Sequence, residues 1–407
     1  MARPVSMRIA IIMNMIAPYT TAVFDRLAQR ADAELFVVYE TAMEPSRQWK
    51  VQRDLPYEHA LLDSWTVDLS WLAVGSGFKT REDTYLYLPK RPVATLSQFS
   101  PDVVIAAGGG IWSSPANLAA LAARRRRGWA YVPWWGSFLR TRPTLPRRLA
   151  DPWVRMFIRS SDAWMAYGTR ASVDLVRLGA DPARIVIAPL VATRAPGPSP
   201  RRRKKPAGEP VRYLFVGRLI ERKGIDVLLD AFRDVDGGEL WIAGDGPLRH
   251  LVETAAADDA HVRLLGHVDG VELERLYREA DVLVLPSYYD VWGLVVNEAQ
   301  VHGLPVIASD EVGAAADLVD DGVNGLVVPT GSSAALAGAM NEIAGWTAAD
   351  RRRCYRRSKE KRDERSAEAA GDAIFEASVI ALEHRRRHSR QGRQEGAIGA
   401  YFRRRNT

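Results

Sequence analysis

The chain has 407 residues, of which 47% are hydrophobic and 26% are charged. This balance is that of a soluble globular protein with more than one domain, and it excludes collagen, coiled coil and bulk disorder. The single cysteine, Cys354, excludes a disulfide framework and any multi-cysteine metal site. No apolar run reaches the roughly 18–20 residues of a membrane span, and the first run, 9–17, is interpreted as a buried strand rather than a signal peptide.

Charge is unevenly distributed along the chain. The net charge is +7, but residues 1–190 carry +8, residues 211–345 carry −14 and residues 346–407 carry +8. Ten arginines lie between residues 124 and 159, with four tryptophans among them. Arginine with tryptophan is typical of a surface that contacts anionic lipid head groups. The arginine and tryptophan content of segment 124–159 therefore predicts contact with a membrane surface rather than with nucleic acid. A solvated face beside a tryptophan-rich core is the alternative.

In the N-terminal half, apolar segments alternate with amphipathic ones. Strands are expected at 8–13, 34–39, 102–106, 129–133, 163–167 and 184–188, and helices at 20–30, 114–127, 147–159 and 169–178. Residues 40–98 show a less regular pattern. The stretch 194–210 contains five prolines and no large apolar residue, so it predicts an interdomain linker.

The alternation restarts more regularly after the linker. Strands are expected at 213–216, 240–243, 262–265, 282–285, 306–308 and 326–328, with helices near 224–233, 247–257, 271–279, 296–302, 314–320 and 332–344. This pattern predicts an α/β protein with two doubly wound parallel-sheet domains, 1–193 and 211–345, whose ligands bind in the crevice between them. Helices at 346–382 are expected to pack back toward the N-terminal domain. The basic tail, 383–407, is expected to be mostly disordered.

A first candidate site follows the first strand of the C-terminal half. Gly217 ends that strand, and Arg218 and Lys223 come before the next helix. Glycine lets the backbone approach a ligand closely, and a guanidinium fork with an ammonium suits a diphosphate. A basic loop without a ligand is the alternative.

A second candidate site lies within 286–309. Asp290 follows a strand, Gly293 and Leu294 stand where the next helix begins, and Glu298 lies within that helix. Backbone N–H groups at a helix N-terminus favour phosphate, and carboxylates on either side can hold hydroxyl groups. The arrangement suits a sugar nucleotide, although an N-cap role for Asp290 and an exposed position for Glu298 are the alternatives.

Residues 211–344 resemble the donor domain of family 4 glycosyltransferases, which have the GT-B fold of two Rossmann-like domains facing a central cleft. The matching segments are VGRLIERKG at 216–224, AGDGP at 243–247, LGHV at 265–268, ADVLVLPS at 280–287, DVWGLVVNEA at 290–299, GLPVIAS at 303–309 and DGVNGLVV at 321–328. The resemblance implies a retaining transfer of a sugar from a nucleotide-diphosphate sugar to an acceptor hydroxyl.

The resemblance also implies roles for single residues. Arg218 and Lys223 would bind the donor diphosphate and stabilise the departing nucleoside diphosphate. Glu298 would hold the ribose hydroxyls, and Asp290 would contact the donor sugar. Further donor contacts would come from Gly217, His267, Trp292, Gly293, Leu294, Val295 and Gly313. Of these, His267 would border the nucleobase.

The chain departs from the family pattern at several positions. The glutamate-x7-glutamate pair begins here with Asp290, whose shorter side chain would alter sugar preference or weaken activity. The family's Gly-Gly-x-x-Glu loop is reduced to Gly313 and Asp317, and Asp317 could alternatively favour a helix start through the macrodipole. His302, where small residues are usual, is expected to be a packing residue.

The N-terminal half matches the family more loosely. Its expected acceptor-side residues are Tyr19, Gly109, Trp135, Ser137 and Tyr167, and burial in the core is the alternative for the aromatic ones. No carboxylate is an obvious nucleophile, so we expect a front-face route in which the leaving phosphate helps deprotonate the acceptor. No Asp-x-Asp pair stands in a metal-binding context, so we expect neither a metal nor a cofactor.

The expected acceptor is a glycan or a lipid-linked hydroxyl of the cell envelope. The protein would then be cytoplasmic and peripheral at the inner face of the cell membrane. Two alternatives remain: a catalytically inactive GT-B binding or assembly protein, and a sugar-nucleotide epimerase or hydrolase. An epimerase or hydrolase would need acid–base residues in the N-terminal half, where none stands out.

Overall fold

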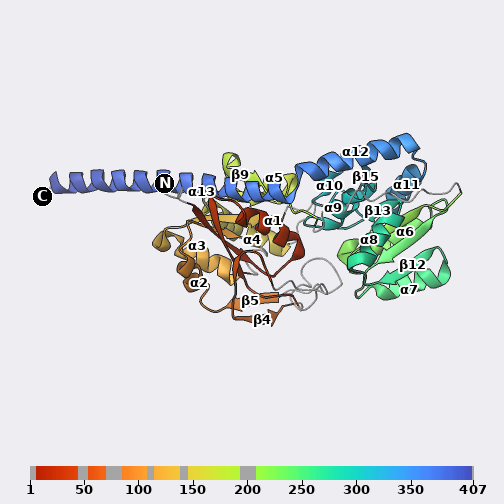
Figure 1. Ribbon diagram of the computed structural model, residues 1–407, viewed down its shortest axis with the longest axis horizontal. Helices are drawn as coiled ribbons and strands as arrows, with labels where there is room; N and C mark the ends of the chain where they lie inside the picture. Colours follow the sequence, from red (N-terminus) through yellow and green to blue (C-terminus); the bar gives the residue numbers. More distant parts are fainter. Residues whose placement is uncertain are drawn as a thin grey trace.

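The computed structural model describes residues 6–44, 54–69, 85–107, 114–137, 145–192 and 208–405. Each half of the chain forms a parallel sheet covered by helices, and the two units lie side by side (Figure 1). The predicted linker falls mostly in 193–207, and Gly109 in 108–113, so both lie outside the described residues.

The N-terminal sheet runs in the order β3-β2-β1-β6-β7-β8-β9, with every neighbouring pair parallel. Its strands are β1 (Met7–Met13), β2 (Ala33–Tyr39), β3 (Glu58–Leu61), β6 (Val103–Ala106), β7 (Ala130–Trp135), β8 (Trp164–Ala166) and β9 (Ile185–Ile187). Strands of a parallel sheet are buried on both faces, which explains continuous apolar runs such as IAIIM, residues 9–13 of β1. The first apolar run is thus a core strand, as expected.

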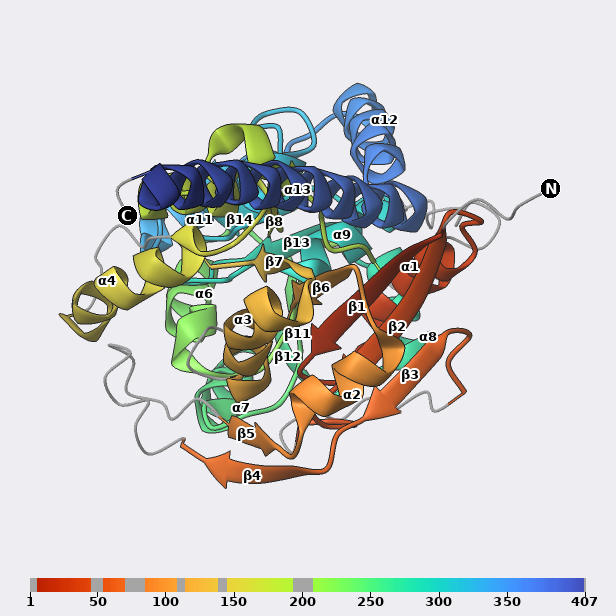
Figure 2. The ribbon, with the colours of Figure 1, turned by 90° about the vertical axis from the view of Figure 1, so that its left-hand side faces the viewer.

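Helices α1 (Pro18–Ala28), α2 (Pro92–Phe99), α3 (Pro115–Arg127) and α4 (Leu145–Arg159) belong to this domain (Figure 2). So does α5 (Thr169–Leu178), which is labelled in Figure 1. The irregular region 40–98 supplies β3, α2 and an antiparallel hairpin of β4 (Ser64–Asp68) and β5 (Tyr85–Pro89). The apolar–polar alternation is weak there because β3 and β4 are short and largely exposed.

The C-terminal sheet runs in the order β12-β11-β10-β13-β14-β15 and is parallel throughout. Its strands are β10 (Arg212–Val216), β11 (Glu239–Ala243), β12 (Val262–Gly266), β13 (Val282–Leu285), β14 (Val306–Ser309) and β15 (Gly325–Val328). Its helices are α6 (Ile225–Phe232), α7 (Arg249–Asp258), α8 (Gly270–Glu279), α9 (Leu294–Val301), α10 (Ala315–Leu318) and α11 (Ser333–Ala344). All follow the expected order, with ends shifted by a few residues.

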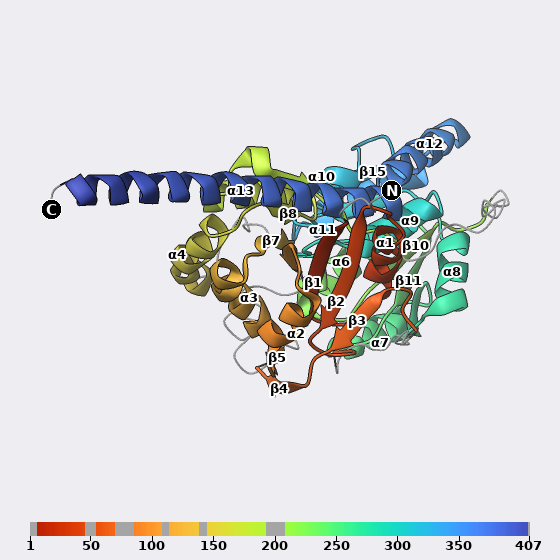
Figure 3. The same cartoon turned by 60° about the vertical axis from the view of Figure 1, so that its left-hand side comes forward.

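Two further helices join the domains. α12 (Ala348–Glu364) packs on α9, and α13 (Ala367–Arg405) crosses to the N-terminal domain, where it contacts α1 and β7 (Figure 3). α13 packs in van der Waals contact with α1, since a Cβ at Gly371 would lie 3.6 Å from the backbone nitrogen of Leu27.

The segment from residue 383, which was expected to be mostly disordered, continues α13. α13 runs to Arg405, and its guanidinium at Arg385 donates to the carbonyl oxygens of Gly128 and Arg124 at 2.9 and 3.0 Å. The segment contains no proline, and its most frequent residue, arginine, favours helix. Its high charge therefore did not prevent regular structure.

Candidate functional site

Loops that follow three neighbouring strands meet at one edge of the C-terminal sheet. Lys223 lies in the 3-10 turn Glu221–Lys223 after β10, and its Nζ donates to Asp290 Oδ2 at 2.5 Å. Asp290 follows β13, and its carbonyl oxygen accepts from the N–H of Gly313, after β14, at 2.9 Å. The structure thus joins the two candidate loops and Gly313 into one cluster.

Close backbone packing fixes the position of this cluster. Gly224 has φ +69°, and a Cβ there would lie 2.1 Å from the carbonyl oxygen of Pro286. Gly244 has φ +158°, and a Cβ there would lie 1.8 Å from the carbonyl oxygen of Gly217. Only glycine permits these approaches. The first brings the Lys223 turn against the loop that carries Asp290, and the second brings the loop after β11 against the end of β10.

The cluster is buried and carries an excess of positive charge. Burial opposes ionisation of Asp290, yet the charges of Lys223 and Arg222 hold the pKa of its carboxyl below the usual range. Burial lowers the pKa of Lys223, as do the charges of Arg222 and Arg218, while Asp290 acts in the opposite direction. Lys223 therefore has two cations and one carboxylate near it, and this surplus of positive charge suits a multiply charged anion.

Helix α9 begins beside this cluster. Its N-cap is Gly293, at φ +96°, so the alternative of an N-cap role for Asp290 is wrong. Because glycine has no capping side chain, the first N–H groups of α9, at Leu294 and Val295, are not capped by it. These groups and the helix dipole form an anion-binding element.

The side chain of Trp292 packs rather than faces a ligand. It is 3% exposed, its indole N–H donates to Asn297 Oδ1 at 2.8 Å, and its ring lies against Gly168 of the other domain. Only the backbone of this residue remains a candidate for donor contact.

Glu298 is half-buried on α9 rather than exposed. The hydroxyl of Tyr277, on α8, donates to Glu298 Oε2 at 2.6 Å. The Tyr277 ring stacks on His302, with centroids 5.5 Å apart and planes 4° apart. The packing role expected for His302 is therefore confirmed.

His267 lines a pocket of about 320 Å³ at the end of β12. The other lining residues are Leu265, Val268, Asp269, Glu272, Arg275 and Leu276. The volume falls at the lower end of the range for small-molecule sites. Asp269, Glu272 and Arg275 give this lining its charged side chains, and the last two pair with each other.

The expected acceptor-side residues are not all brought together. Ser137 Oγ lies 3.5 Å from the hydroxyl of Tyr289 across the domain boundary, and the Tyr167 ring lies against Gly136. Tyr19 is half-buried. Trp135 is 8% exposed in the core, with its indole N–H donating to Asp174, so its side chain does not line an acceptor site.

Asp317 contacts the N-terminal domain instead of forming a donor loop or only favouring a helix start. Its carboxylate accepts from the backbone N–H and the hydroxyl of Thr169 at 2.9 and 2.7 Å. Nearby, Arg170 donates to the carbonyl oxygen of Asp310 and pairs with Glu311 at 3.5 Å. These contacts join α5 to α10 and to the loop after β14.

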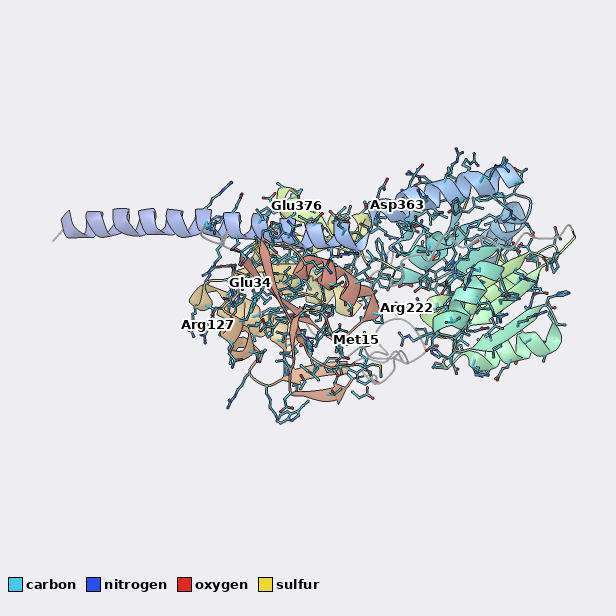
Figure 4. All side chains as sticks on the ribbon, viewed as in Figure 1. Met15, Glu34, Arg127, Arg222, Asp363 and Glu376 are labelled. Carbon is cyan, nitrogen blue, oxygen red and sulfur yellow. The ribbon has the colours of Figure 1, made fainter. Side chains whose placement is uncertain are left out.

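Three residues of this region were missed by the sequence interpretation. Arg222 lies where the two domains face each other, with Met15 on the opposite side (Figure 4), and donates to the carbonyl oxygen of Tyr289 at 3.3 Å. Arg222 belongs to the segment 216–224 that contains Lys223, and this position was the signal in the sequence that could have identified it. No spacing rule pointed to Tyr289 or Tyr277.

Within the described residues, no group of three or more His, Cys, Asp or Glu side chains is placed to hold a metal ion. None of the helices in the part of the chain that the structure describes is long and apolar enough to cross a bilayer.

Comparison with known proteins identifies the C-terminal domain and the fold. Residues 210–345 match the family described as Glycosyl transferases group 1. A phosphatidyl-myo-inositol mannosyltransferase of Mycobacterium leprae is 41% identical over 133 residues, which cover 31% of this chain and 35% of that protein. The amylovoran biosynthesis glycosyltransferase AmsK of Erwinia amylovora is 37% identical over 149 residues, covering 33% and 36%. Such matches span about a third of the length of the curated relatives.

The solved structures match over nearly the whole chain. HepE of Anabaena, in complex with UDP and glucose, superposes with a TM-score of 0.65 at 14% identity, covering 91% of this chain and 98% of that one. The chain therefore has the GT-B fold, and residues 210–345 form a glycosyl transferases group 1 domain.

Proposed function

We propose that this protein is a retaining glycosyltransferase that moves a sugar from a nucleotide-diphosphate sugar to a hydroxyl of a glycan or lipid-linked acceptor of the cell envelope. The observation that carries the proposal is the convergence of Arg218, Lys223, Asp290 and the start of α9 at one sheet edge, in a domain of matching family. The amylovoran biosynthesis protein among the relatives favours an envelope polysaccharide.

The proposed chemistry follows from the charges. As the bond between the anomeric carbon and the phosphate oxygen breaks, negative charge grows on the diphosphate, where Arg218, Lys223 and the α9 N–H groups stabilise it. The acceptor oxygen bonds to the same face of the anomeric carbon, and its proton passes to the leaving phosphate oxygen. These cations neutralise the charge of the diphosphate, which in other enzymes a divalent ion does, so we expect the reaction to need neither metal nor cofactor.

Asp290 has a role in this scheme through Lys223. Its carboxylate holds the ammonium charged and directed, so that a diphosphate meets a cation already in place. Its position beside the start of α9 also suits contact with the donor sugar.

Nucleotide binding tests the donor site. We expect UDP, GDP, ADP or dTDP to raise the melting temperature of the wild type equally with and without magnesium; saturation at 100 times Kd adds about 2.7 kcal/mol. Lys223→Met paired with Asp290→Leu removes the charge pair without leaving a buried unpaired carboxylate, and should abolish the shift. Lys90→Met, at an exposed pair with Asp63, is the control. If no nucleotide shifts the wild type, the catalytically inactive alternative replaces this proposal.

The acceptor and the stereochemistry need an activity assay. Transfer from a labelled nucleotide sugar to extracted envelope lipids and glycans should give a product whose anomeric configuration, read by NMR, equals that of the donor. Inversion would contradict the retaining mechanism. A free sugar or an altered sugar nucleotide as the only product would indicate hydrolysis or epimerisation instead.

We also propose that segment 124–159 contacts an anionic membrane surface. On α4, Trp153 and Met156 are 59% and 56% exposed, whereas Phe157 and Ile158 are buried. At the end of α3, residues 125–127 are exposed arginines. Exposed aromatic and basic side chains on neighbouring elements suit a head-group region.

Arg124 does not belong to that surface. Its guanidinium pairs with Asp162 at 3.0 Å, with side chains 13% and 6% exposed. The test therefore replaces residues 125–127 by glutamine, together with Trp153→Ala, and spares Arg124. The wild type should sediment with phosphatidylglycerol vesicles and not with phosphatidylcholine vesicles. The variant should no longer sediment with phosphatidylglycerol vesicles. Binding that persists in the variant, or is absent in the wild type, would contradict the membrane role.

A further inference from the structure

Tyr277 connects α8 to the glutamate that the family pattern assigns to the ribose. The residue is 2% exposed, and its hydroxyl donates to Glu298 Oε2 at 2.6 Å. Burial and the nearby Glu298 charge raise the pKa of this phenol well above its usual value. The hydroxyl therefore keeps its proton and remains a donor to the carboxylate throughout the physiological pH range.

The Tyr277 ring is held in place on its other side. Glu298 and His302 are four residues apart at the end of α9, so their side chains lie on the same face of the helix. Tyr277 contacts both of them: its hydroxyl bonds the first and its ring stacks on the second. A buried ring with both contacts has little freedom to rotate, so the Glu298 carboxylate receives its hydrogen bond from a fixed direction.

α8 also forms part of the pocket around His267. Leu276 lines that pocket, and the next residue, Tyr277, reaches Glu298. One helix therefore contributes both to the wall of the pocket and to the orientation of the carboxylate.

We propose that Tyr277 is a positioning residue, which holds Glu298 in the orientation that binds the ribose hydroxyls of the donor. The inference rests on the proposed function, since it takes Glu298 to be a ribose ligand. In this proposal Tyr277 does not contact the nucleotide and acts on its binding through Glu298.

Deoxyribose analogues isolate this role. Calorimetry would give the Kd of UDP, GDP and ADP and of their 2′-deoxy forms for the wild type, Tyr277→Phe and Glu298→Gln. The wild type should prefer ribose by about 10-fold or more, because a hydrogen bond to a charged group is lost in the deoxy form. Tyr277→Phe keeps the ring and its stacking, so it should reduce that preference toward the Glu298→Gln value and leave 2′-deoxy binding unchanged.

Tyr213→Phe is the matched control. Tyr213 is equally buried in the same domain, and its hydroxyl donates to the carbonyl oxygen of Met340 at 3.0 Å. This variant should lower the melting temperature without changing the ribose preference. The double variant Tyr277→Phe/Glu298→Gln should be no worse than Glu298→Gln alone, because both changes affect one interaction.

The outcomes separate the inference from the function on which it rests. If Tyr277→Phe weakens ribose and deoxyribose nucleotides by the same factor, or if the two variants add fully, Tyr277 only packs and the inference is wrong while the donor site stands. If the wild type binds no nucleoside diphosphate, the proposed function fails and the inference fails with it.

Discussion

Asp317 of the C-terminal domain caps a helix of the N-terminal domain. α5 begins after Gly168, which offers no capping side chain, and the Asp317 carboxylate accepts instead from the backbone N–H and hydroxyl of Thr169. The same carboxylate lies 3.5 Å from the guanidinium of Arg365, just before α13. A capping interaction that normally forms within one helix therefore ties the two domains together.

Replacing Asp317 by alanine should loosen the domain pair. Loss of a cap costs about 0.5–2 kcal/mol, and here it also removes a contact that sets domain orientation. Thermal unfolding should show the lower stability, and small-angle scattering should show a larger radius of gyration. Ser332→Ala removes a cap within the C-terminal domain, at the start of α11, and should lower stability without changing the radius. An unchanged radius in both variants would show that other contacts hold the domains.

The same methyl group should have opposite effects at two glycines. A Cβ at Gly168 would lie 2.4 Å from Asp317 Oδ2 and 2.6 Å from the Trp292 ring, whereas nothing lies within 4 Å of one at Gly338 in α11. We expect Gly168→Ala to destabilise by about 1–3 kcal/mol through overpacking. Gly338→Ala should stabilise by up to about 1 kcal/mol, since alanine is the better helix former. Thermal unfolding of the two variants gives the sign of each change in stability. If Gly168→Ala leaves the stability unchanged, the contact of Gly168 with Asp317 and Trp292 can shift to accommodate a methyl group.

The Lys223–Asp290 pair should show strong coupling. Lys223→Met leaves a buried carboxylate without its cation, which typically costs about 3–5 kcal/mol. Adding Asp290→Leu removes that charge and should recover most of the loss, although nucleotide binding stays abolished. Urea unfolding of the single and double variants gives the coupling energy. Additive losses would show that the two side chains are independent, in conflict with their 2.5 Å contact.

Local signals in the sequence predicted most of the fold and the positions of the loops that we propose bind the donor. A buried parallel strand needs a continuous apolar run, and a close backbone approach needs glycine, so β10 to β15 and the turn at Gly224 could be located from neighbouring residues alone. The Thr169–Asp317 contact joins residues 148 apart, and the Tyr277–Glu298 bond joins two helices. Neither follows from any periodicity.

Glu40 should make stability depend on pH near neutrality. It follows β2, is 1% exposed, and its Oε1 accepts from the hydroxyl of Ser114, the N-cap of α3, at 3.0 Å. Burial raises the pKa of this carboxyl from 4.5 to about 8, although hydrogen bonds from Ser114 and from the N–H of Ala116 act in the opposite direction.

The sign follows from proton binding in the two states. Between pH 4.5 and about 8 the folded chain holds a proton on Glu40 that the unfolded chain has released, so stability falls as pH rises through this range. Each unit between the two pKa values is worth about 1.4 kcal/mol. Glu40→Gln retains an acceptor for Ser114 but cannot ionise, so it should match the wild type near pH 5 and exceed it at pH 9. Glu34→Gln, at an exposed residue of β2, is the control. The measurement is the melting temperature of the wild type and of Glu40→Gln at each pH from 5 to 9. If the two melting temperatures differ by the same amount at every pH, Glu40 keeps an ordinary pKa, because only a proton bound in the folded state and not in the unfolded state makes the difference depend on pH.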